Sequence, residues 1–235
     1  MKNVAIAEQA LYLAKEKTLV ISDMHIGMEE AMQKKGFLLP RFQLKDFEER
    51  LNRIFLNHAV DIAVFNGDLK HEFGSISATE WRNITSMLEF VGKHAKEIII
   101  IKGNHDILLE PIAKKLNINV RDYYKINDYF ICHGDKLIEN SDFDDSRVLI
   151  IGNEHAAISL RKGGRKELYK CFLLGKFRDK RLIAMPSFNS MTEGTDILQQ
   201  EFIGPFLKQD LGNFDVYISS DKTYHFGKVR NVEAL

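Results

Sequence analysis

The sequence predicts an α/β (α+β) fold in which two mixed sheets pack face to face and helices cover the outside. Three observations favour this class. Short Val- and Ile-rich runs recur along the chain, which is typical of strands buried on both faces. Amphipathic helical patterns separate the early runs and favour parallel pairing of their strands. After residue 129 the runs follow one another closely, which indicates hairpins in a second sheet.

In the first half of the chain, strands and helices are expected to alternate. Each strand is a short apolar run, and each helix has apolar residues every three or four positions with charged residues on its other face. Asp106 is suited to cap the last of these helices, although it is equally suited to assist catalysis. In chain order we expect a strand at 18–22, a helix at 42–55, a strand at 62–65, a helix at 81–91, a strand at 98–101 and a helix at 107–116.

The second half is expected to be mostly strands. Two apolar runs each end in a polar segment, and two further pairs of runs are separated by a few polar residues, as in hairpins. The expected strands are 129–132 and 148–151, followed by a hairpin of 171–175 with 181–185 and a hairpin of 215–219 with 224–227.

Length and composition favour one ordinary globular domain over residues 1–235. The chain has 33 Lys plus Arg and 33 Asp plus Glu, so its net charge gives no support to nucleic-acid binding, which usually needs a basic surface. No apolar stretch is long enough to cross a membrane, and no signal peptide is evident. Cys132 and Cys171 lie in apolar runs, which favours reduced thiols and a cytoplasmic location. The oligomeric state is left open.

Five polar segments follow apolar runs, and they hold five of the eight histidines. They are Asp23-Met24-His25, Gly67-Asp68-Leu69-Lys70-His71, Gly103-Asn104-His105-Asp106, Cys132-His133-Gly134-Asp135 and Gly152-Asn153-Glu154-His155. Ligand sites of open α/β sheets lie beyond the carboxyl ends of the strands, so we expect the five segments to converge. Carboxylate, amide and imidazole ligands without cysteine suit Mn²⁺, Fe or Zn²⁺.

The ordered set Asp-x-His, Gly-Asp-x-x-His, Gly-Asn-His-Asp, His-Gly and Gly-x-x-His, over about residues 18–156, resembles the calcineurin-like metallophosphoesterases. Within that family, residues 66–72, 151–155 and 186–189 resemble the archaeal ICC-like phosphoesterases, a group related to repair nucleases and DNA-ligase-associated phosphoesterases. The resemblance implies a four-layer αββα sandwich, which agrees with the fold expected from the residues.

The resemblance also implies a role for each polar residue. The first metal would be held by Asp23, His25, Asp68 and His155, and the second by Asp68, Asn104 and His133. His105 would be the general acid, supported by His71. Much of the family has a second-metal histidine where this chain has Asn153, so we expect the second site to bind its ion loosely.

The expected reaction is phosphodiester hydrolysis, by in-line attack of a metal-bridging hydroxide at a centre of two divalent ions. Mn²⁺ is favoured, with Fe, Zn²⁺ or Ni²⁺ as alternatives. A basic stretch that includes Arg161, Lys162 and Arg165 is either a solvated loop or a rim that steers phosphate to the metals. Three alternatives stay open: a Mn²⁺-dependent nuclease, a phosphomonoesterase, and a non-catalytic interaction module that retains the fold. The neutral charge disfavours the nuclease, and the presence of His105 disfavours the interaction module.

Overall fold

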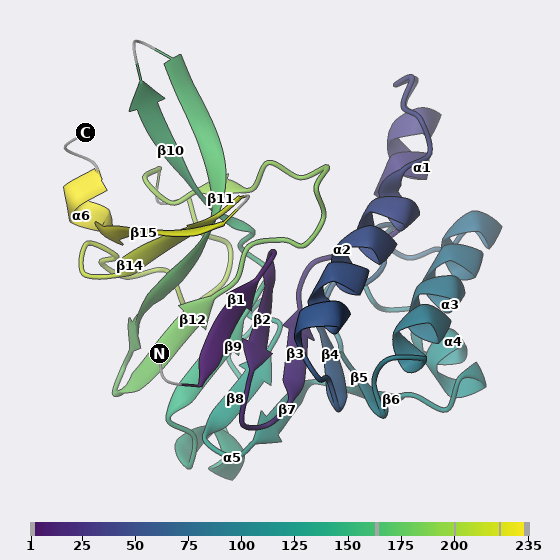
Figure 1. Ribbon diagram of the computed structural model, residues 1–235, viewed down its shortest axis with the longest axis horizontal. Helices are drawn as coiled ribbons and strands as arrows, with labels where there is room; N and C mark the ends of the chain where they lie inside the picture. Colours follow the sequence, from purple (N-terminus) through teal and green to yellow (C-terminus); the bar gives the residue numbers. More distant parts are fainter. Residues whose placement is uncertain (1–2, 163–164, 200, 221, 233–235) are drawn as a thin grey trace.

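A computed structural model of the chain describes residues 3–162, 165–199, 201–220 and 222–232. It contains a six-stranded and a nine-stranded sheet (Figure 1). The first sheet has the order β1-β2-β3-β4-β5-β6, and pairing is parallel from β3 to β6. Its strands are β1 (Val4–Ala7), β2 (Ala10–Leu13), β3 (Thr18–Ile21), β4 (Ile62–Asn66), β5 (Glu97–Ile101) and β6 (Asn119–Arg121).

The second sheet has the order β13-β10-β11-β12-β9-β8-β7, with β14 and β15 attached through β11. Pairing is parallel for β8 with β9 and for β9 with β12, while most other pairs are antiparallel. Its strands are β7 (Tyr123–Ile126), β8 (Tyr129–Cys132), β9 (Val148–Ile151), β10 (Ala156–Lys162), β11 (Arg165–Phe177), β12 (Lys180–Ala184), β13 (Thr195–Asp196), β14 (Asp215–Ser219) and β15 (Thr223–Lys228). Both predicted hairpins are confirmed.

Helices lie on the outer face of the first sheet. Figure 1 shows α1 to α4 grouped on that side, and an apolar cluster that includes Phe47, Ile84 and Ile112 packs them against it. The helices are α1 (Met28–Lys34), α2 (Gln43–Asn57), α3 (Ala78–Gly92), α4 (Glu110–Lys115), α5 (Ser141–Asp144) and α6 (Val229–Val232). The last two are short, and they cover the outer face of the second sheet together with residues 197–199 and 201–214. The expected αββα class is therefore confirmed, with one outer layer that is mostly irregular.

The two sheets are held together by a buried apolar layer between them. Val64 and Ile99 of the first sheet meet Ile131, Ile150 and Phe172 of the second. Each of these residues has 3% or less of its surface exposed, and burying such a side chain fully stabilises the fold by about 1.5–3 kcal/mol. This layer fixes the two sheets relative to each other, and so fixes the polar segments at their strand ends.

Two local features differ from the expected pattern. The predicted helix at 107–116 begins only at Glu110, because residues 104–108 form turns after β5. The N-terminal hairpin of β1 and β2 was not expected, and it extends the first sheet by antiparallel pairing. No helix in the described part of the chain is long and apolar enough to cross a membrane.

Both cysteines are expected to resist alkylation in the folded protein. Cys132 and Cys171 are buried and unpaired, and burial raises the pKa of Cys132 to about 12 and also raises that of Cys171. Since the thiolate is the nucleophile, few reactive sulfurs are present at neutral pH. Iodoacetamide labelling followed by mass spectrometry should find both thiols unmodified in buffer and modified in denaturant. Rapid labelling of the native protein would contradict this prediction.

Candidate metal centre

The five polar segments follow the carboxyl ends of β3, β4, β5, β8 and β9. The first three strands are parallel neighbours in one sheet, and the other two are parallel neighbours in the other. The face-to-face packing of the sheets brings these ends together. As a result, side chains separated by more than a hundred positions lie within hydrogen-bond range of one another.

One group of ligand atoms comes from Asp23, His25 and His155, whose atoms lie within 4.8 Å of one another. The Nε2 atoms of His25 and His155 are 3.1 Å apart, and Nε2 of His155 is 3.5 Å from Oδ1 of Asp23. Ligands bound to one ion at about 2.1 Å are necessarily separated by roughly 3–3.5 Å. The spacing of this group therefore fits a divalent cation.

A second group comes from Asp23, Asp68 and His133, with Asn104 beside it. Nε2 of His133 is 3.2 Å from Oδ1 of Asn104 and 3.5 Å from Oδ1 of Asp68. Nδ1 of His133 lies 3.2 Å from the carbonyl oxygen of Asn66. A hydrogen on Nδ1 that bonds to this carbonyl would leave Nε2 free to act as the ligand.

Asp68 lies between the two groups. Its Oδ1 faces Nε2 of His133 at 3.5 Å, while its Oδ2 faces Nε2 of His25 at 3.7 Å. Each carboxylate oxygen thus faces a different group of ligands. This is the arrangement needed for one carboxylate to bridge two ions.

His25 and His133, which both face Asp68, differ in charge. Burial lowers the pKa of His25 to about 3, and His155 adds to this shift, so His25 is neutral. Burial also disfavours the charged form of His133, but the hydrogen bond to Asp68 and the charge of Asp23 raise its pKa to about 10. A proton on His133 compensates the buried carboxylates. A bound cation would take over that role, because metal binding displaces protons from its ligands.

His105 lies at the edge of both groups, and its ring forms a third group with His25 and His71, whose ligand atoms also lie within 4.8 Å of one another. Its backbone N–H donates to Oδ1 of Asp68 at 3.0 Å, and its Nδ1 is 2.5 Å from the carbonyl oxygen of His71. The ring is thereby oriented with Nε2 toward Oδ2 of Asp68, at 3.8 Å. The ring of Phe73 covers His105 with 3.6 Å between ring centroids. The contact from His71 is made by its backbone carbonyl, and its ring lies 5.9 Å from that of His105.

Asn153 contacts the centre through its backbone. Its N–H donates to both carboxylate oxygens of Asp23, at 3.1 Å each. Its side-chain Nδ2 is buried and has no hydrogen-bond partner among the described residues. Gly204 lies close to this nitrogen: a Cβ added to Gly204 would be 3.2 Å from it.

The turns after β3, β4, β5, β8 and β9, here called the ligand turns, have unusual backbone conformations. Five residues have φ between +46° and +63°, in the left-handed region: Asp23, His25, Asp68, Asn153 and His155. Such a conformation costs about 1–2 kcal/mol for a residue with a side chain. Bonds between neighbouring turns hold it in place, since the N–H of Asp23 donates to Gly67 and that of His25 donates to Asp68.

The ligand turns also pack too closely for larger residues. A Cβ added to Gly67 would overlap the ring of His133, and one added to Gly103 would overlap the carboxylate of Asp68. A Cβ on Gly152 would meet Ser22, whose hydroxyl donates to Asp23 at 2.7 Å. These contacts could not be derived from the motifs alone.

Asp106 has a role that neither sequence-based interpretation anticipated. Its carboxylate accepts hydrogen bonds from the N–H groups of Gly103 at 3.0 Å and Lys70 at 3.1 Å. It therefore joins the turn after β4 to the turn after β5, and it does not cap α4. Burial raises the pKa of this carboxyl, and nearby Asp68 adds to the shift.

The basic stretch is not brought to the ligand groups. Arg161 and Lys162 lie at the end of β10, and Lys162 pairs with Arg165 of β11. The hairpin extends away from the rest of the chain (Figure 1). Since a strand rises about 3.3 Å per residue, Arg161 lies roughly 20 Å along it from His155. Residues 163–164, the expected Gly-Gly turn, lie outside the described residues.

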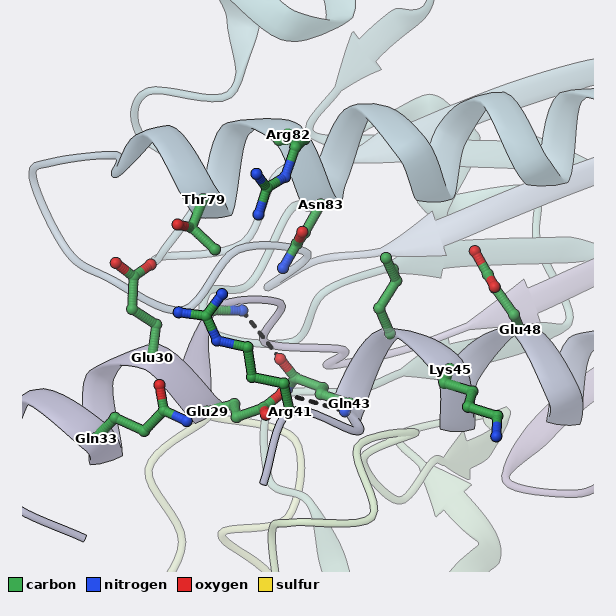
Figure 2. Close-up of a pocket in the computed structure, with 12 residues that line it drawn as sticks. Glu29, Glu30, Gln33, Arg41, Gln43, Lys45, Glu48, Thr79, Arg82 and Asn83 are labelled. Carbon is green, nitrogen blue, oxygen red and sulfur yellow. Dashed lines mark hydrogen bonds between the residues drawn. The ribbon is translucent and has the colours of Figure 1, made fainter. Parts of the chain in front are cut away.

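A cavity of about 280 Å³ lies among α1, α2 and α3, and none of the predicted metal ligands lines it. Figure 2 shows Arg41 and Arg82 pointing into it from opposite sides. Glu29 and Glu30 also line the cavity, so its charge is mixed. Its lining residue Gln43 donates to the carbonyl oxygen of His25 at 3.0 Å, so the cavity lies next to the turn that follows β3.

A model of calcineurin-like phosphoesterases matches residues 16–219. Among solved structures, the chain is similar to the nuclease MPE of Pseudomonas putida, with a TM-score of 0.66, 17% identity, and coverage of 94% of this chain and 92% of that one. It also matches Vps29 of Entamoeba histolytica complexed with Zn²⁺ (TM-score 0.40, 14% identity, coverage 89% and 99%). A predicted phosphoesterase of Streptococcus pneumoniae TIGR4 matches with a TM-score of 0.35, 14% identity, and coverage of 90% and 97%. No curated protein matches the sequence significantly.

Proposed function

Because the chain belongs to the calcineurin-like phosphoesterase family, we propose that it hydrolyses phosphodiesters with two divalent metal ions. The observation that carries this proposal is the position of Asp68, whose two oxygens face different groups of ligands. The family is metal-dependent, and the clustered carboxylates and imidazoles fit that requirement. Mn²⁺ is the favoured ion, and Fe, Zn²⁺ and Ni²⁺ are alternatives with the same ligand preferences.

In this proposal each ion has its own ligands and shares Asp68. The first ion would be held by Asp23, His25, Asp68 and His155, and the second by Asp68, Asn104 and His133, with Asp23 also close to the second group. Asn153, which the resemblance assigns to the second ion, contacts Asp23 through its backbone N–H. When bound, two such ions activate water and neutralise charge on the phosphoryl oxygens.

His105 would protonate the departing oxygen. Its Nδ1 hydrogen is directed at the carbonyl of His71, so Nε2 is the atom available for proton transfer. The backbone bond to Asp68 holds His105 beside the ligand groups. Its ring also lies within ligand distance of His25 and His71, and in this proposal it acts as the acid rather than as a ligand. His71 would support the acid through its carbonyl oxygen.

Nuclease activity is the second candidate. It is favoured by the fold shared with the Pseudomonas putida nuclease over nearly the whole of both chains. The equal numbers of acidic and basic residues do not favour a long nucleic-acid substrate, which is why a small diester is proposed first. Arg161, Lys162 and Arg165 would contact only a substrate that extends well beyond the ions. The two free thiols support a cytoplasmic location.

A substrate screen with added Mn²⁺ tests this proposal. Aryl monoesters, aryl diesters, cyclic nucleotides and labelled oligonucleotides should be compared at equal enzyme concentration. We expect the highest kcat/KM for a diester, and loss of that activity when a chelator is added. Preference for monoesters would identify a phosphatase, and cleavage of oligonucleotides alone would identify a nuclease. No turnover of any ester would favour an interaction module.

Asn153 is expected to weaken binding of the second ion. An amide oxygen is a weaker donor to Mn²⁺ than an imidazole, so Asn153→His should increase second-site affinity. Asn153→Ala should decrease it if the amide is a ligand. Metal counts at graded Mn²⁺ concentrations measure both effects. Equal second-site affinity in all three proteins would show that residue 153 contributes no ligand.

A further inference from the structure

Residues 186–189, after β12, form a buried segment that is hydrogen-bonded to the turn that carries Asp23 and His25. Ser187, Phe188 and Asn189 are each fully buried. The hydroxyl of Ser187 donates to the carbonyl oxygen of Asp23 at 2.7 Å, and the N–H of Phe188 donates to that of Ser22 at 2.9 Å. This segment therefore holds the backbone on both sides of a metal-ligand candidate.

Three of the four carbonyl groups of this segment accept hydrogen bonds from two basic side chains. The amine of Lys170, from β11, donates to Ser187 at 2.9 Å and also to Asn189. The guanidinium of Arg50, from α2, donates to Phe188 at 2.5 Å and lies 3.8 Å from the centre of its ring. Buried backbone carbonyls require partners, and here two cations from different layers supply them.

Burying the charged amine of Lys170 at this position is energetically unfavourable. Burial lowers the pKa of Lys170 to about 7, and the neighbouring charge of Arg50 adds to that shift. The carboxylates of Asp23 and Asp46 oppose the shift. An apolar residue at position 170 would avoid this cost, but it would leave the carbonyl of Ser187 without its partner.

We propose that Lys170 is a positioning residue for the first metal site. It fixes the segment 186–189, and through Ser187 it holds Asp23 in its left-handed conformation. Loss of its amine would free the segment and so misplace the carboxylate of Asp23. This inference rests on the proposed function only in that the site must bind a metal ion.

Lys180 offers a matched control. It is buried, whereas Lys170 is half-buried, and its amine also donates to two backbone carbonyls, those of Asp144 and Ser146, at 2.8 Å each. These carbonyls lie in and after α5, and among the described residues no bond joins them to a turn that carries a predicted ligand. Substitution of either lysine removes a similar set of bonds, but only Lys170 is connected to Asp23.

The test compares Lys170→Met with Lys180→Met by calorimetric titration of the full chain with Mn²⁺, without substrate. We expect the Kd of the tighter ion to rise at least tenfold in Lys170→Met and to change less than twofold in Lys180→Met, with similar losses of Tm. Equal Kd values in the two variants would overturn the proposal. Absence of Mn²⁺ binding to the wild type would instead refute the two-metal function.

A milder variant covers the case in which Lys170→Met does not fold. Ser187→Ala removes only the hydroxyl that donates to Asp23. Loss of one such bond is expected to raise the Kd about three- to tenfold. An unchanged Kd in Ser187→Ala would overturn the connection between the segment and the ligand turn.

Discussion

Replacing His105 by alanine is expected to reduce kcat for a phosphodiester by about 10²–10⁴-fold, the usual contribution of a general acid. The effect should be larger for an alkyl leaving group than for p-nitrophenolate, because a weakly basic leaving group needs little protonation. Both metal ions should remain bound, since the ring of His105 is not assigned as a ligand. The measurements are kcat with both substrates and the metal content of the purified variant.

His225→Ala is the control for this substitution. His225 is half-exposed and pairs with Asp215 on the β14–β15 hairpin, away from the strand ends that carry the ligands. It should retain wild-type kcat and metal content. Wild-type kcat for the alkyl diester in His105→Ala would refute the assignment of the acid. Loss of metal from that variant would make His105 a ligand instead.

Gly67→Ala is expected to remove the second metal site and to lower the free energy of unfolding by about 2–5 kcal/mol. Gly67 has φ of +79°, so any side chain is strained there. The added Cβ would also overlap the ring of His133, which has no space in which to move because it is 1% exposed. Denaturant unfolding and Mn²⁺ titration measure the two losses.

Gly74→Ala is a control that introduces backbone strain without steric overlap. Gly74 also has a positive φ, of +65°, but a Cβ there would meet no atom within 4 Å. We expect this control to lose about 1–2 kcal/mol and to keep both metal sites. If Gly67→Ala behaved like Gly74→Ala, the contact between Gly67 and His133 would not restrict the site.

Much of the site could be predicted because it depends on short-range patterns. The strands that precede Asp23, Asp68 and Asn104 are visible as apolar runs, and parallel strands place their carboxyl ends at one edge. The inter-sheet layer that carries His133 and His155 to the same place was expected from the change of pattern after residue 129. The periodicity of the sequence and the direction of the strands were therefore sufficient to predict that the polar segments converge.

The remaining features depend on contacts between distant residues. Lys170 is one charged residue next to an apolar run, and nothing in that pattern connects it to Asp23. Asp106 looks like a helix cap, but its carboxylate is drawn to the N–H groups of Lys70 and Gly103. Arg161 lies in β10, although its stretch was expected to be either a solvated loop or a rim that steers phosphate, because a polar sequence lacks the apolar run that predicts a strand. The structure at these positions is decided by contacts with residues that are distant in the sequence.

The left-handed ligand turns restrict which residue types can serve at this centre. Among residues with side chains, Asn, Asp and His enter the left-handed region several times more often than others. All five left-handed residues in the polar segments that carry the predicted ligands belong to these three types. Glutamate and cysteine are also good metal ligands, yet such residues enter this region less often, although Glu8 does so elsewhere in the chain. The choice of ligands in this chain therefore reflects the shape of its turns as well as the preference of its metals, and asparagine at position 153 satisfies the first requirement as well as histidine does.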